Sequence, residues 1–122
     1  MHVTNDHRRI LIVDDDPSVR QLLRMILEVE DFEVVGEATD GVEAVPRALE
    51  LCPDVVVLDQ QMPNLDGAAT AEILRVSLPE ALIIACSAII ESKPVWADAF
   101  LAKQNMSDMA PLVQGLIDLR ED

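Results

Sequence analysis

Basic side chains are scarce in this chain. Its 122 residues include nine Lys and Arg against 23 Asp and Glu, which gives a formal net charge of −14. A nucleic-acid-binding domain needs a basic face, so direct nucleic-acid binding by this segment is disfavoured. The acidic balance suits a domain that binds cations or meets a basic partner surface, and it equally suits an acidic surface that only maintains solubility.

Cysteines and long apolar runs are scarce too. The two cysteines, Cys52 and Cys86, are far apart and form no metal-binding pattern, so we expect both to be reduced thiols in the core. No apolar run is long enough to span a bilayer, and the polar residues 1–9 do not resemble a signal peptide. These features predict a cytoplasmic protein without a membrane partner.

Apolar residues, by contrast, are plentiful enough for one core. They make up 50% of the chain, and the length suits a single domain. The sequence contains no internal repeat, low-complexity tract or linker. We therefore expect one domain over residues 1–122, with a folded core over 8–120 and a polar N-terminal tail over 1–7.

Segments of strand length alternate with segments of helical spacing. Five strands are expected, over residues 9–13, 32–38, 54–58, 81–86 and 99–102. Residues 89–96 are too few for a full helix, and Pro94 disfavours helical geometry at Lys93, so a loop or one irregular turn is expected there. The alternation implies βαβ units, which places the chain in the α/β class with a mainly parallel sheet and helices on both faces.

Capping residues mark the expected helices. Asp16 precedes Pro17 at the start of a helix that runs to about residue 30. Residues 40–43 resemble a capping box for a second helix, in which Pro46 is expected to introduce a kink. A third helix is expected to carry Ala69, Ile73 and Val76 on one face, and Ser107 is expected to cap the last helix.

Two of the expected strands end in acidic residues. Residues 10–13 lead into Asp14, Asp15 and Asp16, and residues 55–58 lead into Asp59. Open α/β sheets build their sites at the carboxyl ends of strands. Carboxylates that converge there repel one another unless a cation joins them. The pattern therefore predicts a divalent metal site for Mg²⁺ and a nucleophilic aspartate.

Two further residues complete a candidate site for phosphoryl chemistry. The chain has only two lysines, and Lys103 is the one that follows an apolar strand, where its charge can pair with a phosphoryl group. Ser87 ends another strand and offers a hydroxyl for a hydrogen bond. An aspartate, a metal site, a lysine and a hydroxyl are together the parts needed to form an aspartyl phosphate.

Five motifs follow one another in order: ILIVDDDPSVR at 10–20, VVVLD at 55–59, MPNLDG at 62–67, SA at 87–88 and ADAFLAK at 97–103. As an ordered set, covering nearly the whole chain, they resemble the receiver domains of two-component response regulators. The resemblance implies a flavodoxin-like, doubly wound sheet of five parallel strands in the order 2-1-3-4-5. It also implies that the family's fourth helix is shortened or absent, because the stretch from Ser87 to Lys103 is shorter than the family norm.

The resemblance implies a role for each residue of the site. Asp59 would be the phospho-acceptor, and Ser87 and Lys103 would contact the phosphoryl group. Phe100 stands where the family has a switch aromatic that responds to movement of the hydroxyl residue. The implied Mg²⁺ ligands are four oxygen donors: the carboxylates of Asp14, Asp15 and Asp59, and the backbone carbonyl of Gln61.

The resemblance also implies partners. A sensor histidine kinase or a histidine phosphotransfer protein would supply the phosphoryl group, and the domain would assist its own phosphorylation and dephosphorylation without being a conventional enzyme. A C-terminal effector domain outside this chain, DNA-binding and tied to transcription regulation, is a further expectation, and the chain would be a monomer or weak dimer. Gln104, where many members have proline, and Trp96, where glycine is common, depart from the family pattern.

Two other readings stay open at this point. The spacing Asp14-x-Asp16-x-Ser18 loosely matches haloacid-dehalogenase-type phosphatases, in which Asp14 would be the nucleophile and Asp16 the general acid. No later acidic pair completes the metal site of such an enzyme. The short segment before Lys103 also fits a protein-interaction module that works on a receiver scaffold independently of phosphorylation.

Overall fold

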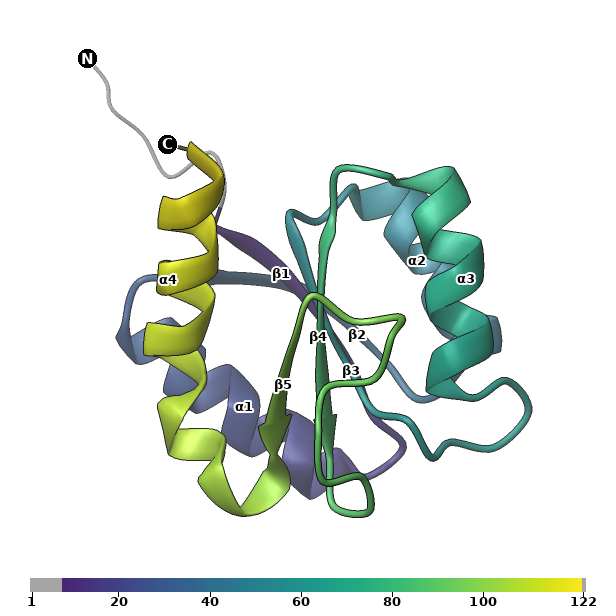
Figure 1. Ribbon diagram of the computed structural model, residues 1–122, viewed down its shortest axis with the longest axis horizontal. Helices are drawn as coiled ribbons and strands as arrows, with labels where there is room; N and C mark the ends of the chain where they lie inside the picture. The colour runs from purple at the N-terminus through teal and green to yellow at the C-terminus, as the bar shows by residue number, and fades with distance from the viewer. Residues whose placement is uncertain (1–7, 122) are drawn as a thin grey trace.

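The computed structural model describes residues 8–121, so the tail expected over 1–7 lies outside the described residues. One parallel sheet has the strand order β2-β1-β3-β4-β5 (Figure 1). Its strands are β1 (Arg9–Val13), β2 (Glu33–Ala38), β3 (Val55–Leu58), β4 (Leu82–Ser87) and β5 (Ala99–Ala102). The predicted α/β class and strand order are confirmed.

Helices cover both faces of the sheet (Figure 1). They are α1 (Pro17–Val29), α2 (Gly41–Leu51), α3 (Gly67–Ser77) and α4 (Met109–Glu121), and a 3₁₀ segment, η1 (Lys103–Asp108), leads into α4. One face is covered by α1 and α4, and the other by α2 and α3. None of the described helices is both long and apolar enough to cross a membrane.

The central strands are buried on both faces, which explains their continuous apolar sequence. Ile10 and Ile12 pack in the cluster formed with α1 and α4, whereas Leu11 and Val13 pack in the cluster formed with α2 and α3. The period of two along β1 thus divides its side chains between two cores. Both cores hold the carboxyl end of β1 in place, where Asp14 follows.

Aspartate side chains cap the first three helices as hydrogen-bond acceptors. Asp16 accepts from the Ser18 backbone N–H at 2.9 Å and Asp40 from that of Glu43 at 2.8 Å, as the sequence predicts. Asp66 caps α3 by accepting from the Ala69 N–H at 2.9 Å. Each cap satisfies backbone donors that the first helical turn leaves free, and thereby fixes where the chain turns from strand or loop into helix.

Some sequence predictions about helix faces and ends are wrong. Ile73 and Val76 are 39% and 82% exposed, so the face predicted for α3 is its outer face. The buried residues of α3 are Gly67, Thr70, Ala71 and Leu74, and the first of them lies directly against the backbone after β3. A Cβ on Gly67 would lie only 2.8 Å from Gln60 Cα. Small size therefore decides the packing at the start of α3.

Two other local predictions also fail. Cys86 is buried as expected, but Cys52 is exposed at the C-terminal end of α2, where it adopts a left-handed conformation (φ 48°). Ser107 does not begin the last helical segment, since η1 is already helical from Lys103. α2 runs through Pro46 to Leu51.

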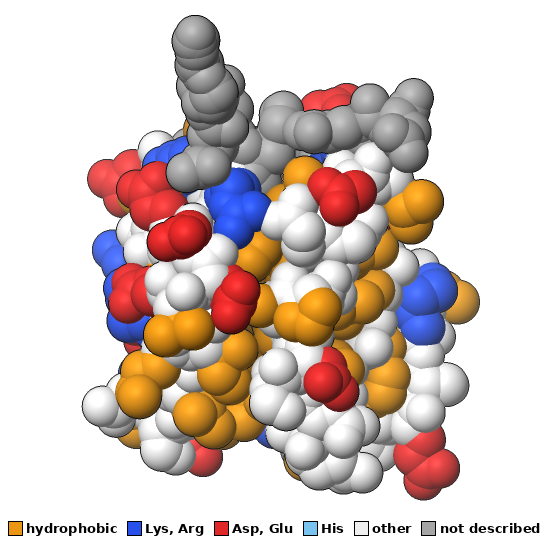
Figure 2. Space-filling view, turned by 90° about the vertical axis from the view of Figure 1, so that its left-hand side faces the viewer, with side chains coloured by type: hydrophobic (Ala, Val, Ile, Leu, Met, Phe, Trp, Pro, Cys, Tyr) orange, Lys and Arg blue, Asp and Glu red, His pale blue; other side chains and the backbone are white. Residues whose placement is uncertain are grey.

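Not every apolar side chain enters the core, and apolar and acidic groups share the outer face of α1 and α4 (Figure 2).

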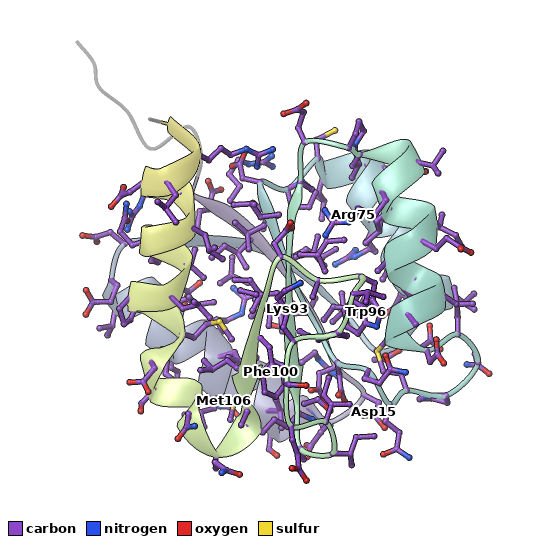
Figure 3. All side chains as sticks on the ribbon, viewed as in Figure 1. Asp15, Arg75, Lys93, Trp96, Phe100 and Met106 are labelled. Atoms are coloured by element: carbon purple, nitrogen blue, oxygen red, sulfur yellow. The ribbon has the colours of Figure 1, made fainter. Side chains whose placement is uncertain are left out.

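The connection from β4 to β5, residues 88–98, contains no helix and lies wholly within the described chain. The helix labelled α4 follows β5, so the helix that the family places before its last strand is absent, as predicted. Charged side chains hold this crossover (Figure 3). Asp98 accepts hydrogen bonds from the Ile83 N–H at 2.7 Å and from Arg75 at 3.1 Å, and Arg75 also donates to the Trp96 carbonyl at 3.0 Å.

Candidate functional site

A pocket of about 540 Å³ opens at the carboxyl edge of the sheet. Because β1, β3 and β4 are parallel, the residues that follow them meet at this edge. Asp15 marks its position at the lower end of the sheet in Figure 3. The pocket lining includes six residues that the sequence analysis names: Asp15, Asp16, Asp59, Gln61, Ser87 and Lys103.

Lys103 joins the two buried carboxylates of the site. Its Nζ lies 2.8 Å from Asp14 Oδ2 and 3.2 Å from Asp59 Oδ2. Asp14 and Asp59 are 2% and 4% exposed, whereas Asp15 is exposed. A buried carboxylate pair is costly unless a cation offsets the repulsion, and the Lys103 ammonium supplies that charge in this structure.

The pKa values of the two partners reflect this arrangement. Burial raises the pKa of Asp14, and the hydrogen bond from Lys103 only partly opposes this effect. For Lys103, burial lowers the pKa, but the hydrogen bond and charge of Asp14, together with the charge of Asp59, outweigh burial and raise it. Lys103 is therefore a firmly held cation at neutral pH, and Asp14 is the carboxylate whose ionised form is penalised by burial.

Three carboxylates of the site are close enough to bind one ion. Ligand oxygens of Asp14, Asp15 and Asp59 all lie within 4.8 Å of one another. Hard oxygen donors without nitrogen or sulfur suit Mg²⁺, which keeps several waters and needs few protein ligands. The donor set thus fits the cation expected from the sequence. Gln61, whose carbonyl is the expected fourth donor, lines the same pocket.

Ser87 also reaches this pocket, but Phe100 does not. Ser87 is 1% exposed at the end of β4, and its Oγ accepts a hydrogen bond from the Ile89 N–H at 3.3 Å. Phe100 instead lines a separate pocket of about 600 Å³ between the crossover and the start of η1, together with Ile90 and Ala102. Phe100 therefore lies apart from the carboxylates of the site, and its role as a switch residue stays a prediction.

Sequence reasoning missed one residue that contacts the site. Arg20 donates from Nη1 to the backbone carbonyl of Asp14 at 2.6 Å. Its place in the first turns of α1 was visible in the sequence, but nothing there showed that its side chain turns back to the β1–α1 junction. The Arg75–Asp98 contacts of the crossover were missed for the same reason, since they join residues far apart in sequence.

Comparison with known proteins agrees with this geometry. The family model described as "Response regulator receiver domain" matches residues 10–109. The chain belongs to this family. It is 42% identical over 103 residues to a chemotaxis protein CheY of Thermotoga maritima, covering 79% of this chain and 85% of that protein.

Two further similarities define what part of a relative is matched. A protein-glutamate methylesterase/protein-glutamine glutaminase of T. maritima is 38% identical over 92 residues, which cover 75% of this chain but only 27% of that enzyme. A structure of the response regulator TrrA from T. maritima, in complex with Mg²⁺-BeF, aligns with a TM-score of 0.81 and 32% identity. The alignment covers 89% of this chain and 98% of that one. The chain thus matches receiver domains, and not the larger part of the methylesterase.

Proposed function

We propose that this chain is a phospho-acceptor receiver domain, in which Asp59 takes a phosphoryl group from a phosphohistidine of a histidine kinase or phosphotransfer protein. The observation that supports it best is the convergence of Asp14, Asp15 and Asp59 carboxylates within 4.8 Å, with Lys103 paired to two of them. Such a cluster provides a nucleophile, a cation site and a fixed positive charge together.

In the proposed reaction, a carboxylate oxygen of Asp59 attacks phosphorus in line with the phosphorus–nitrogen bond. That bond breaks, and the imidazole nitrogen of the donor leaves with the electron pair and is protonated by solvent. Bound Mg²⁺ would neutralise charge on the phosphoryl oxygens, and Asp14, Asp15, Asp59 and the Gln61 carbonyl are its proposed ligands. Lys103 would move from pairing two carboxylates to pairing a phosphoryl oxygen, while the Ser87 hydroxyl would donate a hydrogen bond to another.

The phosphatase alternative has little support in the geometry. A general acid at Asp16 should face the substrate with a free carboxyl group. Asp16 lines the pocket but caps α1, with Oδ1 accepting hydrogen bonds from both the N–H and the hydroxyl of Ser18. These bonds lower the pKa of Asp16, which makes it a poor proton donor at neutral pH.

The test is phosphorylation by a small phosphodonor with Mg²⁺, followed by intact-mass measurement. Wild-type protein should gain one phosphoryl group, and Asp59→Asn should gain none. The matched control is Asp66→Asn, which changes a carboxylate in the adjacent loop that caps α3 and lies outside the proposed donor set. Its labelling should equal that of wild type.

The outcome distinguishes three hypotheses: a phospho-acceptor receiver domain, a phosphatase and a phosphorylation-independent interaction module. Labelling on Asp14 would support the phosphatase, and no labelling of wild type beside a labelled control receiver would contradict the phospho-acceptor role. Partner binding that survives Asp59→Asn and ignores the phosphodonor would favour the interaction module, a reading motivated by the helix-free crossover. The module reading would also predict that Phe100→Ala weakens the partner without affecting labelling.

The output of the domain is a separate proposal. We propose a cytoplasmic domain that presents its phosphorylation state to a partner or to an effector domain. Of the two sequence relatives described above, one is a chemotaxis protein and the other a methylesterase, so the expected link to transcription stays a prediction. Monomer–dimer state is likewise a prediction, checked by sedimentation of the phosphorylated and unphosphorylated chain.

A further inference from the structure

Every polar group of Asp14 has a hydrogen-bonding partner. Its N–H donates to the Ala38 carbonyl at 3.1 Å, Oδ1 accepts from the Asp16 N–H at 2.9 Å, and Oδ2 pairs with Lys103 at 2.8 Å. The remaining group, the backbone carbonyl, accepts from Arg20 at 2.6 Å. This last bond is the only one of the four that ties the Asp14 main chain to a side chain.

Arg20 is itself fixed at a second point. Its Nε lies 3.0 Å from Glu37 Oε1, and its side chain is only 15% exposed. Glu37 stands on β2 directly beside Ile12 in the sheet register, two residues before Asp14. One guanidinium therefore connects three parts of the fold: α1, strand β2 and the junction at which β1 delivers Asp14.

The charge of Glu37 is secured by two arginines. Burial raises its pKa, but hydrogen bonds from Arg24 and then Arg20 outweigh burial and lower it. Glu37 is therefore an ionised acceptor at neutral pH. Arg24 contacts Glu37 Oε2 at 2.8 Å and also Glu28, without a hydrogen bond to Asp14 in the structure. The two arginines share an acceptor, and only Arg20 extends the connection to the site.

We propose that Arg20 is a positioning residue for the cation site: through Glu37 it holds the Asp14 main chain so that the Asp14 carboxylate faces Asp59 and Asp15. The proposal rests on the proposed function, because it concerns the same acidic pocket. A lysine would not reproduce the arrangement, because an ammonium is a point charge whereas a guanidinium presents several donors in one rigid plane.

Outer groups that orient metal ligands typically change metal affinity about 10- to 100-fold when removed. Calorimetric titration with Mg²⁺ should therefore show an affinity loss of about tenfold or more in Arg20→Gln, and a smaller loss in Arg20→Lys. Arg24→Gln is the matched control, since it removes one guanidinium from Glu37 and leaves the Asp14 contact in place. Its Mg²⁺ affinity should stay within about twofold of wild type, well below the effect expected for an orienting group.

Phosphodonor labelling gives a second readout that a merely structural role would not produce. The Mg²⁺ concentration for half-maximal labelling of Asp59 should rise in Arg20→Gln, whereas the maximal rate at saturating Mg²⁺ should be nearly restored. Urea unfolding of each variant shows whether the fold is retained. If Arg20→Gln does not fold, Arg20→Lys takes its place in the calorimetric and labelling measurements.

Equal Mg²⁺ affinity in folded Arg20 variants and Arg24→Gln would overturn the proposal. A loss of maximal rate that saturating Mg²⁺ does not recover would also overturn it, because Arg20 would then act on something other than cation binding. Failure of the proposed function looks different: wild type would not be labelled, yet calorimetry would still compare the variants. The two ideas can therefore fail separately.

Discussion

The connections that leave β3 and β4 start at the same edge of the sheet but are held in different ways. After β3, the chain passes through a short loop into α3, and backbone groups hold that loop: the Gly67 N–H donates to the Gln60 carbonyl at 2.9 Å, and the Gly41 N–H to the Leu65 carbonyl at 3.2 Å. After β4, the crossover returns to β5 without a helix, and Arg75 and Asp98 are its principal side-chain anchors.

The difference shows that the residues around the site are held in position by different kinds of contact. Asp59 is placed by two cores and a tightly packed turn, so its position depends on shape and close contact. The crossover that follows Ser87 depends on two charged side chains, Arg75 of α3 and Asp98 of the crossover itself. We therefore expect changes that overpack the turn after β3 to affect both folding and phosphorylation, and changes in the crossover anchors to affect folding alone.

The largest effect is expected from Gly67→Ala. The new Cβ would lie 2.8 Å from Gln60 Cα, so the backbone beside Asp59 has to move. Overpacking of this kind costs about 1–3 kcal/mol or more of unfolding free energy. Urea unfolding measures the stability loss, and intact-mass labelling should show slower phosphorylation of Asp59. Normal labelling in a destabilised protein would mean that the turn does not position the site.

A smaller effect is expected from Asp98→Ala in the crossover. The change leaves the Ile83 N–H without its acceptor, which costs about 1–2 kcal/mol for an unsatisfied buried donor, and it removes one of the two hydrogen-bond partners of Arg75. Labelling of Asp59 should be unchanged. The comparison is Asp108→Ala, in the exposed part of η1, which should leave both stability and labelling as in wild type. Slower labelling in Asp98→Ala would show that the crossover after β4, like the turn after β3, affects phosphorylation of Asp59.

The smallest effect, with the opposite sign, is expected from Asp14→Asn without Mg²⁺. Burial raises the folded-state pKa of Asp14 above its usual 3.8, so the ionised form is disfavoured in the folded protein. The contribution of Asp14 to stability is full below the unfolded-state pKa and is lost as pH rises through the folded-state pKa. Asp14→Asn should therefore be as stable as wild type in acid and more stable at neutral pH.

Urea midpoints measured across the pH range check this prediction. The same series with Mg²⁺ should reverse the order at neutral pH, because wild type gains stability from the bound cation and the variant gains less. A variant that is less stable than wild type at neutral pH without Mg²⁺ would show that the pairing of Asp14 with Lys103 outweighs the cost of its burial.

Much of the fold was predictable because it follows from local rules. Apolar strand segments, aspartate caps and the short segment before Lys103 each have a signal within a few residues, and the structure agrees with them. Predictions failed where close approach mattered: Ile73 and Val76 look like core residues, but α3 turns Thr70, Ala71 and Leu74 to the sheet. Periodicity reports hydrophobicity and does not report how near two backbones come.

In the candidate site, too, residues with a local sequence signal were predicted and residues that depend on tertiary contacts were not. Asp14, Asp15, Asp59, Ser87 and Lys103 were found from the sequence because each follows an apolar strand, and parallel strands end at one edge. Arg20 and its partner Glu37, 17 residues apart, were not, and neither were Arg75 and Asp98, 23 residues apart. These pairs have no periodic or motif signal, because long polar side chains can reach in many directions.

The meeting of these residues at the carboxyl edge could be predicted from the chain alone, because apolar parallel strands that are buried on both faces bring their acidic ends to one edge of the sheet. How those residues are held is visible only in the folded molecule. The Arg20 guanidinium fixes the Asp14 main chain, and the Arg75–Asp98 pair fixes a crossover without a helix. The reason is physical: strand placement follows from side-chain hydrophobicity summed over many residues, whereas the direction of one charged side chain depends on the few atoms that surround it after folding.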